Sequence, residues 1–238
     1  MEAALHNADL LLQNRYDMAR FLDTQRGTTL DFGSEFRPAL RLKPLLGRHP
    51  NFAELEGVIT NGMPYRYAVE LGEEPRAKEV AAQIERGNHK SAQANPEQVG
   101  RLLAKDVAHG FAMVVPTDLV PLIPGAMVQP TGLAEQWVLD EAGKRKVKCR
   151  ITQDLTYAIE KGEPTSVNSR IDMKAYPEMI YGWCLPRIIH FIVALRLAWP
   201  SKSIFIAKYD YSDAYRRIAH SAKAVAQTIT TLGALAFV

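Results

Sequence analysis

The side chains with the clearest chemical potential are Asp210 and Tyr215, near the end of the sequence. Residues 203–207 are mostly β-branched or aromatic and follow Pro200, so they predict a buried strand that carries Asp210 to the edge of a sheet. A carboxylate at that edge is a suitable oxygen ligand for a divalent metal ion. The spacing of the carboxylate and the aromatic residue therefore favours a metal-dependent nucleotidyl transfer site. The plainer alternative is a carboxylate that only caps a turn.

Positive charge is concentrated in the second half of the chain. The net charge is only +3, but residues 144–217 contain 14 Lys and Arg against 7 Asp and Glu. A polyanion such as nucleic acid is the natural partner of such a segment. An ordinary solvated basic surface is the alternative, and charge alone does not separate the two.

The composition predicts a folded protein without a membrane span. Hydrophobic residues make up 47% and charged residues 23% of the 238 positions, which is ordinary for a globular chain. Cys149 and Cys184 are far apart and have no Cys or His pair at metal-ligand spacing, so neither a zinc site nor a disulfide framework is expected. The N-terminus lacks the apolar core of a signal peptide, and charged residues interrupt the most apolar window, residues 180–199. We expect an intracellular protein, cytoplasmic or nuclear, that is neither secreted nor membrane-spanning.

The first hundred residues are predicted to be mostly helical. Apolar positions recur at helical spacing over residues 2–24, and a turn-rich segment follows through Pro44. Three further helices have start and stop signals such as Asn95-Pro96, and they are expected over residues 51–59, 75–86 and 96–109.

Beyond Gly110, short apolar runs predict strands. They cover residues 111–115, 126–128, 134–139 and 146–152, with a hairpin turn at residues 140–144. A second hairpin is expected over residues 227–238, with an exposed apolar edge at residues 234–238. Between the hairpins, a long helix over residues 177–198, bent by Pro186, is expected to pack His190, Trp183 and Trp199. The predicted fold class is α+β.

Three motifs occur in the order and approximate spacing found in reverse transcriptases. They are Arg-x-x-x-Asp-Leu at residues 150–155, Ser-Val-Asn-Ser-Arg-Ile at residues 166–171 and Asp-Tyr-Ser-Asp-Ala-Tyr at residues 210–215. Through these motifs, residues 100–238 resemble the fingers and the first palm motif of an RNA-directed DNA polymerase of a retrotransposon-like element. Residues 46–50 and 88–90 resemble the leader of such polymerases. The expected domains are a helical N-terminal extension, residues 1–98, and reverse-transcriptase-like fingers with the start of an incomplete palm, residues 99–238.

The resemblance implies roles for the residues of the palm motif. Asp210 and the backbone carbonyl of Tyr211 would hold Mg²⁺ or Mn²⁺ in a complete palm. The backbone amides of Asp213 and Ala214 would face the triphosphate of a dNTP. Tyr215 would lie under the sugar, where its ring excludes a 2′-hydroxyl group.

The resemblance also implies roles in the fingers. Arg150 would pack on the incoming base and contact phosphate, which suits a planar guanidinium group. Asp154 and Asn168 are expected to hold neighbouring segments of the chain in place. Contacts with an RNA or DNA template-primer are expected from Lys144, Lys146, Lys148, Arg170 and Lys174.

Two features depart from the pattern of the family. The lysine expected near the fingers tip is absent, because residues 134–136 read Ala-Glu-Gln. The paired aspartates of the palm are expected beyond Val238, in the remainder of the polymerase chain. Because one carboxylate cannot fix two metal ions, the chain alone is expected not to polymerise DNA. A non-catalytic nucleic-acid-binding module and a decayed retroelement relic are the alternatives.

Overall fold

The computed structural model describes residues 1–28, 38–160, 162–176, 182–207 and 218–238. Helices and strands are both present, which confirms the predicted α+β class. The chain forms two compact units, Met1–Ile171 with Tyr215–Val238, and Asp172–Ala214. The N-terminal helices and the strands both belong to the first of these units.

The N-terminal helical pattern is divided between two helices, α1 (Glu2–Gln13) and α2 (Met18–Thr24). The helical pattern predicted over residues 2–24 is confirmed, but it is interrupted because Arg15 and Tyr16 adopt φ values of 55° and 59° after the end of α1. Asp17 then accepts hydrogen bonds from the backbone amides of the first turn of α2. This break lets both helices bury side chains in one core.

Five more helices precede the strands in the part of the chain that the structure describes. They are α3 (Ala39–Leu46), α4 (Phe52–Asn61), α5 (Glu73–Arg86), α6 (Lys90–Gln93) and α7 (Pro96–Ala108). The predicted helices at 51–59, 75–86 and 96–109 are confirmed by α4, α5 and α7. In contrast, α3 occupies part of the segment predicted to be turn-rich and contains Pro44.

A small antiparallel sheet lies at the centre of the first unit. Its strands are β1 (Val114–Pro116), β4 (Thr230–Leu232) and β5 (Leu235–Phe237), in the order β1-β5-β4. The second predicted hairpin is therefore confirmed, but its outer strand is not an exposed edge. β1 covers the free side of β5, and Ala236 is completely buried. The pairing joins segments about 120 positions apart, which local sequence patterns cannot reveal.

Hydrophobic clusters cover both faces of this sheet. On one face, Val115 and Ala236 pack with residues of α1, α2 and α5. On the other, Val114 and Phe237 pack with residues of α1 and α7 and with Leu133. Alternate residues of a strand point to opposite faces, so three short strands join two clusters.

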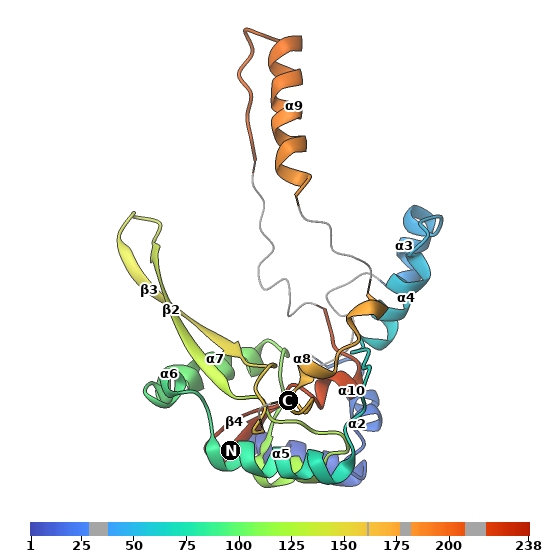
Figure 1. The fold of residues 1–238 in the computed structure, drawn as a ribbon, viewed down its shortest axis with the longest axis vertical. Helices are drawn as coiled ribbons and strands as arrows, with labels where there is room; N and C mark the ends of the chain where they lie inside the picture. Colours follow the sequence, from blue (N-terminus) through green and yellow to red (C-terminus); the bar gives the residue numbers. More distant parts are fainter. Residues whose placement is uncertain (29–37, 161, 177–181, 208–217) are drawn as a thin grey trace. The chain divides into compact units, whose positions relative to one another are not determined.

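The longest strands, β2 (Thr131–Leu139) and β3 (Arg145–Gln153), form a separate two-stranded hairpin (Figure 1). Nine residue pairs connect them, from Thr131 opposite Gln153 to Leu139 opposite Arg145. This confirms the predicted hairpin and lengthens both of its strands.

The second unit departs most from expectation. Its long helix, α9 (Cys184–Ala198), begins two residues before Pro186, so the proline lies in the first turn and does not bend the helix. No residue of α9 is buried; His190 is exposed, as are Trp183 and Trp199 beside the helix. The short 3₁₀ turn Met173–Ala175 precedes it. Within the described residues, every helix is too short or too polar to cross a membrane.

The strand predicted at residues 203–210 is not formed by residues 203–207, the part of it that the structure describes. Residues 203–207 have no regular structure, and Phe205 is 91% exposed. The remaining positions, 208–210, lie outside the described residues. A β-branched and aromatic run needs a partner strand to form a sheet, and local composition does not supply one.

Residues 62–68 hold both chain segments that flank the second unit. Tyr67 pairs with Ile171, and Met63 pairs with His220. Gly62 has a φ of 78°, and a Cβ atom there would lie 2.4 Å from the carbonyl oxygen of His220. Gly62 is therefore required both for this backbone conformation and for the close approach to His220. Burial of His220 in this contact region lowers its pKa.

Gly62→Ala is expected to lower the free energy of unfolding by about 2–4 kcal/mol, because the new Cβ strains the backbone and displaces His220. Gly233→Ala is the matched control, since Gly233 also has positive φ but has open space around it. It should cost only about 1 kcal/mol. Urea unfolding followed by circular dichroism measures both. Equal losses would show that contact with His220 does not determine the residue at position 62.

Candidate nucleic-acid interface

A tight turn closes the β2–β3 hairpin. The Asp140 carboxylate accepts hydrogen bonds from the backbone amides of Ala142 and Lys144, at 3.0 and 2.8 Å. Gly143 adopts a φ of 75°, a conformation that favours glycine. The turn fixes the register, and the register decides which side chains share a face of the hairpin.

One face carries three cations, and we call Lys146, Lys148 and Arg150 the basic face. They alternate along β3 and therefore point to the same side, about 7 Å apart. The residues opposite them on β2 are uncharged: Val138, Gln136 and Ala134. All three cations are exposed, and none forms an ion pair with any described residue.

Hydrophobic packing determines that this face remains exposed. On the opposite face, Leu133 is buried and Ile151 and Cys149 pack against the cluster that contains Val99 of α7. The one acidic residue of β2, Glu135, lies on that apolar face, opposite Cys149. A one-residue register shift would exchange the two faces, so the core specifies the basic surface.

The loop between α5 and α6 anchors the base of the hairpin. The Asn88 side chain accepts from the Thr131 amide at 2.8 Å and donates to the Thr231 carbonyl at 2.6 Å. His89 donates its backbone amide to the Thr131 carbonyl at 3.0 Å. Just after the loop, the hydroxyl group of Ser91 in α6 accepts from the Leu133 amide at 3.0 Å. These bonds connect β2 to both the helical region and the central sheet.

The ends of the hairpin strands are connected to the same loop. The Asp154 carboxylate lies 3.1 Å from Nε2 of His89, and its other oxygen accepts from the Thr156 amide at 3.1 Å. Thr156 accepts in turn from the Asn168 side chain at 2.9 Å. Asp154 and Asn168 thus hold neighbouring chain segments, as expected from the sequence.

No family model, curated protein or solved structure matches the chain. Function is therefore inferred from its own residues.

The predicted site residues are distributed over different parts of the chain, and some of them lie outside the described residues. Lys144, Lys146, Lys148 and Arg150 lie exposed on the hairpin. Lys174 is exposed in the second unit. The palm-motif residues, Asp210, Tyr211, Asp213, Ala214 and Tyr215, lie outside the described residues. In the described part of the chain, no three His, Cys, Asp or Glu side chains form a group that could hold a metal ion.

Arg170 does not fit the expected contact with template phosphate, because it is only 2% exposed. Its guanidinium group donates to Gln227 at 2.6 Å and to the Ser166 carbonyl at 3.3 Å, and lies 4.4 Å from the centre of the Tyr67 ring. Burial lowers its pKa, although Tyr67 and Glu70 partly oppose that shift. Arg170, at the end of the short helix α8 (Val167–Arg170), is thus a structural residue.

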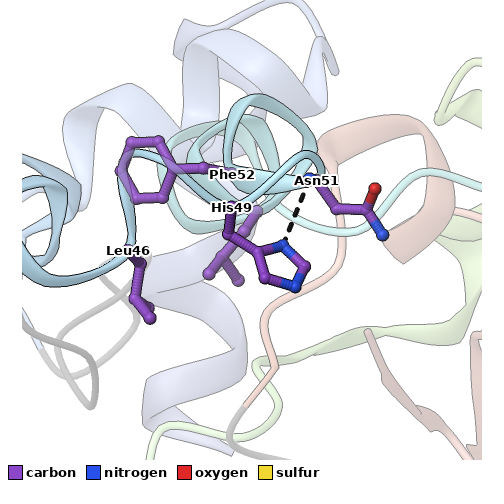
Figure 2. Close-up of a pocket in the computed structure, with 5 residues that line it drawn as sticks. Leu46, His49, Asn51 and Phe52 are labelled. Carbon is purple, nitrogen blue, oxygen red and sulfur yellow. Dashed lines mark hydrogen bonds between the residues drawn. The ribbon is translucent and has the colours of Figure 1, made fainter.

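A pocket of about 250 Å³ lies between α3 and α4 (Figure 2). Its lining is mostly apolar, and Nδ1 of His49 accepts a hydrogen bond from the Asn51 amide at 3.2 Å. None of the five lining residues is charged, so the pocket does not suit a phosphate ligand. Its lining residues all come from residues 46–55 and include none of the basic face.

Three residues that lie near the base of the hairpin are Arg86, His89 and Tyr157, and of these only His89 belongs to a segment singled out in the sequence, residues 88–90. The sequence contains one indirect signal, the polar run after Gly87 at the end of α5. Their proximity depends on folding α5 against a loop some 70 positions later, and a linear pattern does not report such contacts.

Arg170→Met is expected to lower the free energy of unfolding by about 2 kcal/mol, because Gln227 and Ser166 lose buried donors. It should leave nucleic-acid affinity and its salt dependence unchanged. Lys148→Met, the control, should show the reverse, with unaltered stability and weaker binding. Urea unfolding and fluorescence anisotropy with an RNA–DNA hybrid measure the two properties. Loss of binding in a stable Arg170→Met protein would instead assign Arg170 to the interface.

Proposed function

We propose that this chain is the fingers and early palm part of an RNA-directed DNA polymerase, and that its β2–β3 hairpin binds a template-primer strand. The observation that carries the proposal is the basic face: three exposed cations on one side of a hairpin, without an acidic residue opposite any of them. Phosphate groups of nucleic acid are suitable counterions for such a row, since each neutralised phosphate releases condensed cations.

The motif residues of the fingers also support this proposal. Arg150 lies on β3, Asp154 follows its end, and Asn168 contacts Asp154 through Thr156. Residues separated in the sequence are therefore joined by short hydrogen bonds. Two of the three motifs are therefore adjacent in the described structure, which is compatible with the resemblance.

The chemistry proposed for the palm motif comes from the resemblance. Mg²⁺ or Mn²⁺ bound by Asp210 and Tyr211 would supply charge stabilisation for nucleotidyl transfer from a dNTP to a primer hydroxyl. Asp213 and Ala214 would bind the triphosphate, and Tyr215 would exclude ribonucleotides. Arg150 would contact the incoming nucleotide from the fingers, where its planar group can both stack and donate.

A non-catalytic nucleic-acid-binding module is the second candidate. It is favoured by the fact that the basic face alone, without the palm residues, is sufficient for phosphate binding. The two candidates differ in their response to nucleotide: a polymerase part should bind a complementary dNTP in the presence of Mg²⁺ and hybrid, and a binding module should not.

The triple variant Lys146→Ala, Lys148→Ala and Arg150→Ala is expected to bind an RNA–DNA hybrid at least about tenfold more weakly. The slope of log affinity against log salt should fall by roughly 2 to 3, one phosphate contact per cation. The control, Arg20→Ala, Arg26→Ala and Lys78→Ala, removes the same charge from exposed positions on or beside α2 and α5. Anisotropy titrations at several salt concentrations measure both slopes. Equal slopes in the two triple variants would contradict the proposed interface.

Asp210→Asn is expected to leave hybrid affinity unchanged and to abolish Mg²⁺-dependent stabilisation of the hybrid complex by a complementary dNTP, because a neutral amide is a poor metal ligand. The dissociation rate of labelled hybrid, with and without dNTP and Mg²⁺, is the measurement. A mismatched dNTP is the control. If the complementary dNTP has no effect even on the unaltered chain, the non-catalytic module is the better description.

A further inference from the structure

A cluster of polar and aromatic side chains adjoins the basic face at the base of the hairpin. We define this base cluster as Arg86, His89, Asp154 and Tyr157. The Arg86 guanidinium carbon lies 4.0 Å from the centre of the Tyr157 ring. The rings of His89 and Tyr157 meet edge to face, with centroids 6.0 Å apart. All four residues are partly buried, so they form an ordered group that solvent still reaches.

The base cluster lies on the same side of the hairpin as the basic face. Gly132 and Thr152 are a cross-strand pair two positions from Ala134 and Arg150, so they share that face. A Cβ atom at Gly132 would lie 2.8 Å from the Thr152 hydroxyl, 3.6 Å from the Ser91 hydroxyl and 3.9 Å from Cδ2 of His89. The row from Lys146 to Arg150 is therefore followed by Thr152, Ser91 and His89.

The Arg86 guanidinium group is held in place by neutral groups. One nitrogen donates to the Gly87 carbonyl at 3.2 Å, and the guanidinium forms no ion pair with a described carboxylate. Stacking on Tyr157 holds its plane while leaving N–H groups at the edge. A planar donor group held in this way suits two oxygens of a phosphate.

The acidic member of the cluster does not cancel this charge. Asp154 is committed to His89 and to the Thr156 amide, one with each oxygen. The two cations, Arg86 and neighbouring Lys90, outnumber this single carboxylate, so the cluster has an excess of positive charge. An anionic ligand is thus favoured over a cationic one.

We infer that Arg86, supported by Tyr157 and beside His89, binds a backbone phosphate of the nucleic-acid strand that lies along the basic face. The inference rests on the proposed function and extends the interface from β3 to the loop between α5 and α6. A small polar surface, formed by Gly132, Thr152 and Ser91, lies between the basic face and the base cluster. One nucleic-acid strand could therefore contact both.

Arg86→Gln tests this, with Lys78→Gln on the same helix as the control of equal charge. Arg86→Gln should weaken hybrid binding about three- to tenfold and lower the salt slope by roughly 1, whereas Lys78→Gln should change affinity less than about twofold. Thermal unfolding verifies that both variants fold. Indistinguishable binding by the two variants overturns the inference.

The basic-face triple variant, titrated in parallel, distinguishes failure of the role proposed for Arg86 from failure of the proposed function. If the triple variant binds weakly and Arg86→Gln binds normally, the inference fails and the proposed function stands. If neither variant is impaired, the proposed function fails as well.

A second measurement uses the unaltered chain and does not depend on the folding of a variant. Phenylglyoxal modification of Arg86, followed by mass spectrometry, should slow at least about threefold when hybrid is bound, while modification of Arg101 on α7 stays constant. Equal modification of Arg86 with and without hybrid overturns the inference. Protection by a dNTP alone would assign the bound phosphate to a nucleotide and would overturn its assignment to a strand.

Discussion

The fold depends on the docking of the loop between α5 and α6 onto the first residues of β2. Asn88 bonds to Thr131 and Thr231, and thereby joins the hairpin to the central sheet. These bonds satisfy backbone groups at the point where β2 leaves the core, and an unpaired buried backbone group would be costly. Because the same loop connects α5 and α6, the N-terminal helices help to orient the basic face. A hairpin of only two strands has little stability of its own, so this anchor is what orients it.

Burial divides the arginines and lysines of residues 144–174 into two groups. Arg170 and the cations of the basic face come from the same stretch of sequence, and charge counts treat them alike. The structure separates them: Arg170 is buried and packs on Tyr67, whereas Lys148 is exposed and forms no ion pair with a described residue. A cation exposed to water can bind a phosphate group and release the counterions condensed on nucleic acid. A buried cation that is bonded to neutral groups cannot contact a nucleic-acid strand. The interface therefore follows from register and burial together.

Local signals predicted much of this fold. The Asn95-Pro96 start of α7, the Gly87 end of α5 and the turn at residues 140–144 act through neighbouring atoms, so the sequence displays them directly. Longer-range features were missed: β5 is central because β1 pairs with it, and Arg170 is buried because Tyr67 and Gln227 surround it. The basic row was predicted because a period of two is visible in β3, but the base cluster was not, since Arg86 and Tyr157 meet only in three dimensions. The palm motif, from Asp210 to Tyr215, lies outside the described residues, so its roles remain predictions from resemblance.

The central claim is that one face of the β2–β3 hairpin binds the nucleic acid, and site-specific photocrosslinking tests it most directly. An RNA–DNA hybrid that carries photoreactive groups on its backbone would be bound, irradiated and digested, and the attached peptides mapped by mass spectrometry. The account predicts crosslinks to Lys146, Lys148 and Arg150 and to the loop that contains His89, all suppressed by high salt. Crosslinks confined to the apolar face, around Trp137 and Val147, or to helices remote from the hairpin, would contradict it.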